Sequence, residues 1–362
     1  MGRNRVIYQS EALYCGGTGD TSLTVGSNQI GRVQSANYSF DIARTDVNQI
    51  GQVAAIDSII LEQPPVSLDF SYLVTTGAAE TIIGLDVGAN SAISSILSGD
   101  DLTTRKDVQN YYIYTASEGN DAVGSTAGNA GDSVIAIGNG FLSSYSVEGG
   151  VGEFVTANVS VEALNMAFHN QTISTVPNPT VNPVDGAALN AGTEVTIPNA
   201  SAVTGSTTPS ALRPGDVVVT IPDASVKGFD DADLKVQNFS ISFDLSRTNL
   251  EKLGSKFAFS KEIEFPAQAS CDFSAILGDT EAAKNDDALI DILTTDTAHT
   301  VIVNCVGYDS TVGVKYSLLG GKVDNYSISS SIGDNKSLDM TFTSQIGGPQ
   351  DTSNGIKIEA TT

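Results

Sequence analysis

The chain has 362 residues and a formal net charge of −24, which is divided almost equally between residues 1–165 and 214–362. Its 35 glycines, its many serines, threonines and asparagines, and its low proportion of charged residues are typical of a β-rich protein of two domains with many turns. An acidic surface repels phosphate, so the charge argues against direct binding of nucleic acid, and no apolar run is long enough to span a membrane.

Most strands are predicted from alternation of apolar and polar residues. Tyr38, Phe40 and Ile42, for example, alternate with polar or small residues, which places the three large side chains on one face. In chain order, we predict strands at residues 5–15, 38–43, 66–72, 108–115, 134–137, 141–147 and 155–161, and later at residues 217–221 and 356–359.

Three segments interrupt this pattern in the first part of the chain. Residues 44–52 are polar, which predicts a bulged loop, and residues 54–61 form an apolar segment that ends at Pro64 and Pro65. Residues 117–131 are rich in Gly, Asn, Asp and Ser, which is typical of a long surface loop.

Two short helices are predicted. Residues 92–97 carry their apolar side chains at helical spacing, so we expect a helix that covers the sheet and ends at Gly99. Residues 281–293 predict a longer and more acidic helix at the corresponding place in the second part of the chain.

An internal repeat relates the two parts. Residues 39–71 return as residues 242–274 at a constant offset of 203, with SFD-x-x-RT at one end and S-x-DFS at the other. Chance rarely produces both matches in one register, so we infer a duplication. Identical pairs include Phe40 and Phe243, Asp41 and Asp244, Arg44 and Arg247, and Asp69 and Asp272.

Weaker matches extend the repeat. Residues 92–98 resemble residues 288–294 at an offset of 196, and residues 145–161 resemble residues 326–342 at an offset of 181. The offset falls from 203 to 181 along the chain, which indicates extra residues in the first copy. We assign these extra residues to the predicted surface loop at residues 117–131.

The repeat predicts the domain organisation. We expect a first domain at residues 1–165, a connector or insertion at residues 166–213, and a second domain at residues 214–362. The connector holds five prolines and almost no charge, yet its β-forming residues are not those of a flexible Gly/Ser linker.

The sequence contains no recognisable catalytic or metal-binding motif. The two histidines, His169 and His299, lie in different parts of the chain and have no nucleophile motif beside them. Acidic residues at positions 230, 231 and 233 lack the ligand spacing of a calcium loop. We therefore predict no enzyme, no cofactor and no metal site. The three cysteines have neither disulfide nor metal-ligand spacing, and we expect buried free thiols at Cys15, Cys271 and Cys305.

Three extended segments resemble a known family. Residues 40–73 contain ARTDVNQIGQVAAID and PPVSLDFSYL, residues 110–122 read NYYIYTASEGNDA, and residues 135–165 read IAIGNGFLSSYSVEGGVGEFVTANVSVEALN. These segments are similar to the tail tube (major tail) proteins of tailed bacteriophages. The resemblance covers most of residues 1–165 and extends, more weakly, through the repeat to residues 214–345, which lack the SEGNDA loop.

This resemblance implies two duplicated β-sandwich domains of the tail-tube type, each with a short flanking helix and long loops. Family subunits form rings of six tube domains that stack into a tube, so a chain with two domains implies a homotrimeric ring with pseudo-sixfold symmetry. DNA passes through the lumen during ejection without specific binding. The implied partners are further copies of the chain and the tape-measure, tail-terminator and distal tail proteins. The implied location is the virion tail, assembled in the host cytoplasm without a membrane.

Acidic side chains on the lumen face would keep DNA mobile by repulsion. The candidates are four aspartates that the repeat relates in pairs: Asp41, Asp69, Asp244 and Asp272. The same residues could instead solvate an outer face or pair with Arg44 and Arg247.

Other functions remain open on the sequence alone. A two-domain β-sandwich adhesion or glycan-binding module predicts an exposed aromatic cluster, but tryptophan is absent. An enzyme with an unrecognised acidic site would need carboxylates that converge within one copy. A capsid-decoration or distal tail protein would give isolated capsomers or one ring rather than a filament.

Overall fold

The computed structural model describes residues 10–61, 64–97, 107–117, 119–124, 131–170, 175–189, 192–201, 211–221, 234–277, 297–307, 312–332, 335–348 and 351–361. The fold is mainly β, as predicted, and its strands pair antiparallel in one large sheet and three small hairpins. Several predicted features lie outside the described residues: the helix at residues 281–293, the acidic cluster at residues 230–233, Gly99 and about half of the loop at residues 117–131.

We call the first part of the described chain the N-terminal unit. It has three short helices, α1 (Val25–Asn28), α2 (Ala78–Ile82) and α3 (Ser94–Leu97). Its strands are β1 (Glu11–Gly17), β2 (Gln29–Ile30), β3 (Val33–Phe40), β4 (Thr45–Val47), β5 (Asp57–Ile59), β6 (Val66–Leu73), β7 (Val108–Thr115), β8 (Ser133–Gly150), β9 (Thr156–Ala163), β10 (Asn165–Asn170), β11 (Thr175–Pro177) and β12 (Glu194–Thr196).

The remainder is the C-terminal unit, which opens with the short 3-10 helix η2 (Pro214–Asp216). Its strands are β13 (Val217–Thr220), β14 (Leu234–Asp244), β15 (Arg247–Leu250), β16 (Ser260–Ile263), β17 (Ala267–Leu277), β18 (His299–Val306), β19 (Gly313–Ser329), β20 (Ser337–Ile346) and β21 (Gly355–Thr361).

One long strand in each unit connects two sheet layers. The first part of β8 pairs with β7 and β10, and its last part pairs with β9. The first part of β19 likewise pairs with β18 and β21, and its last part with β20. Apolar side chains fill the space between the layers, for example Phe70 and Tyr111, whose rings lie 6.1 Å apart.

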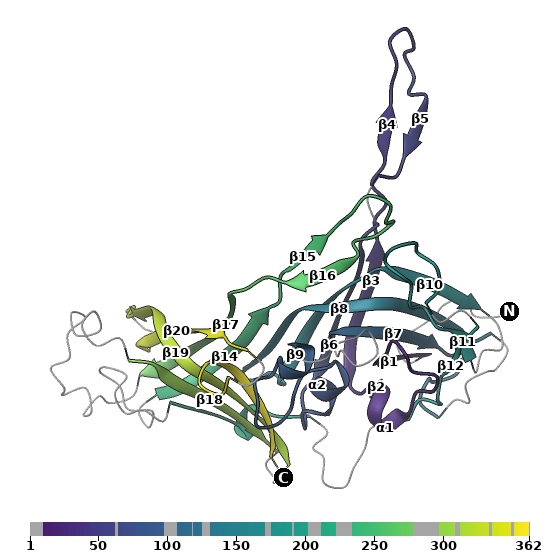
Figure 1. Ribbon diagram of the computed structural model, residues 1–362. Coiled ribbons are helices and arrows are strands. Elements are labelled where there is room, and N and C mark those ends of the chain that lie inside the picture. The colour runs from purple at the N-terminus through teal and green to yellow at the C-terminus, as the bar shows by residue number, and fades with distance from the viewer. Residues whose placement is uncertain are drawn as a thin grey trace.

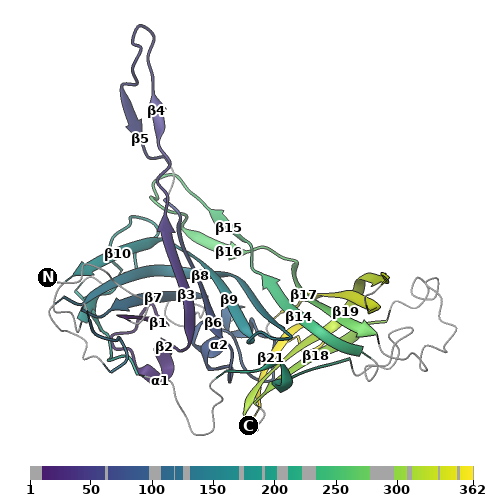
Figure 2. The same cartoon turned by 180° about the vertical axis from the view of Figure 1, so that it is seen from behind.

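A single sheet passes through both units because β14 pairs with the end of β8. We call the strand series β3-β6-β9-β8-β14-β17-β20-β19 the shared sheet, with only the last parts of β8 and β19 included. Figures 1 and 2 show these strands running from the N-terminal unit into the C-terminal unit. The two units are therefore joined by backbone hydrogen bonds as well as by side chains.

The strand registers repeat at the offsets read from the sequence. In β3 and β6, Asn37 lies opposite Asp69, and 203 residues later Ser240 lies opposite Asp272 in β14 and β17. In β8 and β9, Tyr145 lies opposite Val159, and 181 residues later Tyr326 lies opposite Met340. The bulge within β8 also has a counterpart at the same offset in β19.

A buried polar cluster lies between the two units. The Glu80 carboxylate on α2 accepts hydrogen bonds from the hydroxyls of Tyr72 (2.9 Å), Tyr145 (2.9 Å) and Tyr316 (3.0 Å). Tyr316 belongs to the C-terminal unit, so this cluster connects α2 to both units. Because a buried carboxylate is costly unless it is hydrogen-bonded, all three donors stabilise it.

Local differences from the sequence predictions are informative. Residues 44–61, which were predicted as a polar loop and an apolar segment, form the β4–β5 hairpin. Its apolar side chains are exposed because no described strand covers them. The predicted helix at residues 92–97 is shorter, and α3 covers only Ser94–Leu97, with Ile96 buried. Two helices, α1 and α2, were not predicted because each is only one turn long.

The predicted connector is ordered where it is described. Its first residues belong to β10, which pairs with β8, and β11 and β12 form a hairpin. Val176 and Val195 pack against Tyr14 and Tyr112 of the N-terminal unit. Gly138 in β8 lets the connector approach closely, because a Cβ there would lie 2.1 Å from the Pro179 carbonyl oxygen.

Candidate assembly surface

One face of the shared sheet is polar from edge to edge. Alternation along each strand directs serine, threonine, asparagine and acidic side chains to this face and directs the large apolar side chains into the core. Serine pairs hydrogen-bond across neighbouring strands, such as Ser39 with Ser67 and, 203 residues later, Ser242 with Ser270. The face is therefore a continuous polar surface with the same side-chain pattern in both units.

The four predicted acidic residues are on or beside this face. Asp69 in β6, Asp244 in β14 and Asp272 in β17 are exposed there, and Asp41 follows β3 directly and is also exposed. Thr341 donates a hydrogen bond to Asp272 at 2.6 Å. The structure thus places these carboxylates on or beside one surface of the sheet.

Sequence reasoning missed further acidic residues of the same face. They alternate with buried residues along their strands, just as Asp69 does, so period-two alternation could have identified them. These exposed residues are Glu148 in β8, Glu162 in β9 and Asp339 in β20.

The shared sheet ends in two open edges within the described chain. At one edge β3 pairs with β6 alone, and at the other the last part of β19 pairs with β20 alone. Large apolar side chains are exposed at both edges, with Phe40 51 %, Tyr326 41 % and Ile328 43 % exposed. Open edges with exposed apolar residues are unusual in a monomer, because they can pair with another chain.

Two hairpin arms extend from corresponding ends of the shared sheet. The first arm, β4–β5, stands away from the body, and the second arm, β15–β16, lies close to the N-terminal unit (Figures 1 and 2). Both arms turn through a glycine with positive φ, Gly51 at 95° and Gly254 at 89°. Ile50 and Val53 at the tip of the first arm are fully exposed.

The second arm is fixed to the N-terminal unit by charge and packing. The Arg247 guanidinium lies 3.5 Å from the Asp107 carboxylate, with both side chains buried, and 5.0 Å from the centre of the Phe141 ring. Lys261 forms an ion pair with Glu162 and also lies over Phe141. The first arm has no comparable support among the described residues, although its Arg44 is the counterpart of Arg247 and hydrogen-bonds only the Ser58 carbonyl.

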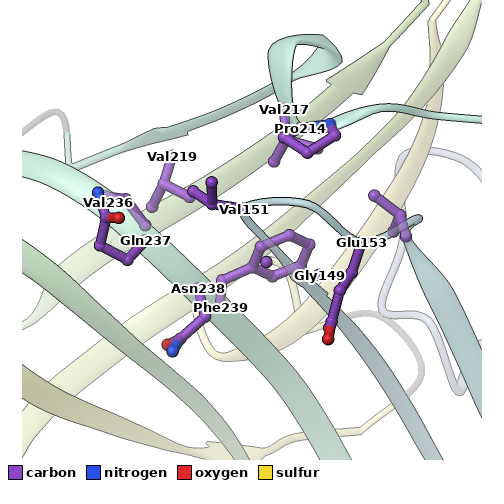
Figure 3. Close-up of a pocket in the computed structure, with 12 residues that line it drawn as sticks. Gly149, Val151, Glu153, Pro214, Val217, Val219, Val236, Gln237, Asn238 and Phe239 are labelled. Carbon is purple, nitrogen blue, oxygen red and sulfur yellow. The ribbon is translucent and has the colours of Figure 1, made fainter.

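A small pocket lies between the two units. Figure 3 shows it between the β8–β9 turn, β13 and β14, where valines surround the Phe239 ring. Among the described residues that line it, Glu153 is the only acidic one, and none is a lysine, arginine, histidine or cysteine. These described lining residues offer no pair of groups for acid–base chemistry.

The remaining reactive side chains are separate from one another. His299 is buried against Phe342, and burial lowers the pKa of His169. Cys15, Cys271 and Cys305 are buried free thiols, as predicted, and burial raises the pKa of both Cys271 and Cys305 to about 12. Among the described residues no three His, Cys, Asp or Glu side chains could hold a metal ion, and no helix there could cross a membrane.

Comparison with known proteins adds no identification. No protein-family model matches the chain, and a comparison with curated proteins gives no match. The shared sheet, its polar face, its edges and its arms are therefore the features that bear on function.

Proposed function

We propose that the protein is a structural virion protein whose copies assemble into closed rings that stack as a bacteriophage tail tube. In this proposal the chain carries two tube domains from a duplication, and genome DNA passes along the polar face of the shared sheet. The main support is that one continuous sheet crosses both units with a polar, acidic face and two open edges. The family resemblance in residues 1–165 supports the same assignment.

Ring closure would remove both edges. If the last strand of one copy pairs with the first strand of the next, every backbone group of the shared sheet gains a partner, as in a closed barrel. An assembly built from head-to-tail contacts closes when the rotation between neighbours divides a full turn, and it otherwise forms a filament. We propose closure by three copies, so that two tube domains in each chain give pseudo-sixfold symmetry.

The dimensions are consistent with a conduit. Three copies of an eight-stranded sheet, with strands about 4.8 Å apart and tilted by roughly 40°, give a barrel about 48 Å across between strand axes. Side chains on the inner face leave an opening of roughly 35 Å, which is wider than a nucleic-acid duplex.

The acidic face fits a surface past which DNA moves. If the polar face lines the lumen, then Asp41, Asp69, Asp244 and Asp272, repeated around the ring, repel the phosphates and disfavour binding. This role requires no catalytic group, cofactor or metal. It does require that the side chains remain exposed after assembly.

Negative-stain electron microscopy of the purified protein across a concentration series tests the proposal. Hollow rings or stacked tubes with threefold averages are expected. Rings with six copies would keep the function but refute two tube domains in each chain. Isolated single rings would favour a distal tail protein, and monomers at every concentration would favour the binding module, for which glycan binding would be measured next.

A further inference from the structure

The joint between β8 and β14 within one chain provides a template for the contact between chains. In this joint Phe243 lies opposite Tyr145, Ser242 opposite Ser146, and Ile241 opposite Val147. Phe243 and Tyr145 are only 2 % and 1 % exposed, and their rings lie 5.5 Å apart. The two strand edges are therefore fully covered where they meet inside the chain.

The same strand positions form the open edges of the shared sheet. Subtracting 203 from the β14 positions gives β3, and adding 181 to the β8 positions gives the last part of β19. Phe40 is thus the counterpart of Phe243, and Tyr326 is the counterpart of Tyr145. An aromatic pair that is buried inside the chain has exposed counterparts at the two ends of the sheet.

From these positions we infer that β3 of one copy pairs antiparallel with the last part of β19 of a second copy, in the register of the β8–β14 joint. This inference rests on the proposed ring and specifies which edges meet and which residues face each other. The predicted cross-chain pairs, transferred from the joint, are Asp41 with Asn325, Phe40 with Tyr326, Ser39 with Ser327, Tyr38 with Ile328, and Asn37 with Ser329.

The side-chain chemistry of the transferred register is consistent. The Phe–Tyr pair and the serine pair recur without change, and the third pair is apolar at both places. A slip by one residue would place Phe40 opposite Ser327 or Asn325 and turn apolar residues toward the polar face, which disfavours it. Cross-strand aromatic and serine pairs each stabilise a sheet modestly, so matching pairs select one register.

The second arm shows what the first arm would cover. It contacts Phe141 and Glu162 of the N-terminal unit, whose counterparts at an offset of 181 are Lys322 and Thr343. Those two residues line an open hollow in the C-terminal unit, together with Asp324. We therefore expect the exposed β4–β5 arm of the copy that supplies β3 to lie over this hollow in the copy that supplies β19.

Paired cysteines test the register. Directly opposed residues of antiparallel strands have Cα atoms about 4.5–5.5 Å apart, within the range that a disulfide can bridge. The chain carrying Ser39→Cys and Ser327→Cys should therefore form covalent dimers and trimers after mild oxidation, seen on a non-reducing denaturing gel. The native cysteines are buried and should not contribute.

Two matched variants serve as controls. Ser146→Cys with Ser242→Cys occupies the joint inside the chain and should form a disulfide without increasing the molecular mass. Ser39→Cys with Ser331→Cys is displaced by four residues, or about 13 Å, and should not link.

The outcomes separate the register from the proposed function. Links between chains that carry Ser39→Cys and Ser327→Cys, without links in the displaced pair, support the inference. Rings in the microscope without that link, or equal linking of the displaced pair, would refute the register but retain the ring. Covalent pairs without any ring would support the edge contact and refute the tube, and absence of both links and rings would refute both.

Discussion

The two related phenylalanines, Phe40 and Phe243, provide a direct test of the repeated joint. Phe243 is 2 % exposed inside the chain, whereas Phe40 is 51 % exposed at the open edge. Replacing a fully buried phenylalanine by alanine costs about 3–5 kcal/mol, so Phe243→Ala should lower the free energy of unfolding by that amount. Phe40→Ala should lower it by less, about 2 kcal/mol, because half of its side chain already contacts water in the single chain.

The effect of Phe40→Ala should appear in assembly instead. Burying the exposed half of a phenylalanine, about 100 Å², stabilises a contact by about 2.5 kcal/mol. Since about 1.4 kcal/mol changes a dissociation constant tenfold, the dissociation constant of each contact between copies should rise roughly 60-fold. Sedimentation velocity across a concentration series should therefore show that Phe40→Ala needs a much higher concentration than the unmodified protein to assemble.

Both measurements are needed for each variant. Urea unfolding at a concentration below assembly gives the stability of the chain, and sedimentation gives the association. Equal destabilisation of the single chain by Phe40→Ala and Phe243→Ala would contradict the difference in burial. Unchanged assembly of Phe40→Ala would show that β3 does not form the contact between copies.

Three further predictions concern buried polar and ionisable side chains. Glu80→Ala removes the shared acceptor of three buried tyrosine hydroxyls, of which those of Tyr145 and Tyr316 can still bond each other at 3.3 Å, and should cost about 2–6 kcal/mol in urea unfolding, whereas Glu80→Gln keeps an acceptor and should cost less. Arg247→Ala leaves Asp107 buried without this ion-pair partner and should cost about 3–5 kcal/mol, whereas Arg44→Ala, on the exposed arm, should have almost no effect on the same measurement. Burial raises the pKa of Cys271 and Cys305 to about 12, so the folded chain keeps protons that the unfolded chain loses above pH 9. The free energy of unfolding should then fall by about 1.4 kcal/mol per pH unit for each thiol between pH 9 and 12, and a Cys271→Ala, Cys305→Ala variant should show a shallower decline.

Most strands could be predicted from sequence because they depend on local pattern. Alternation in residues 66–72 and 155–161 fixes which side chains face the core, whatever the neighbouring strands are. The offsets of 203 and 181 then reappear as strand registers because register is set by the same alternation. The burial of the three cysteines followed from their chemical type and spacing.

The acidic face was predicted only in part. Asp69 and Asp272 stood out because the sequence match at an offset of 203 aligns them, whereas Glu148 and Asp339 have no acidic residue at the position offset by 181. The shared sheet places all four on one surface through strand pairings that join residues far apart in the chain.

The sequence by itself determined which residues can form the strands of each unit and which of their faces is apolar. It could not distinguish Phe40 from Phe243, because both occur in the same local context, SFD-x-x-RT. Tertiary structure decided that β8 covers the strand edge at Phe243, whereas the strand edge at Phe40 stays open. It also decided that the second arm is buried against the N-terminal unit and that the first arm is exposed. The physical reason is that local pattern fixes the direction of a side chain, whereas burial requires a neighbour that only the folded chain, or a second copy of it, supplies.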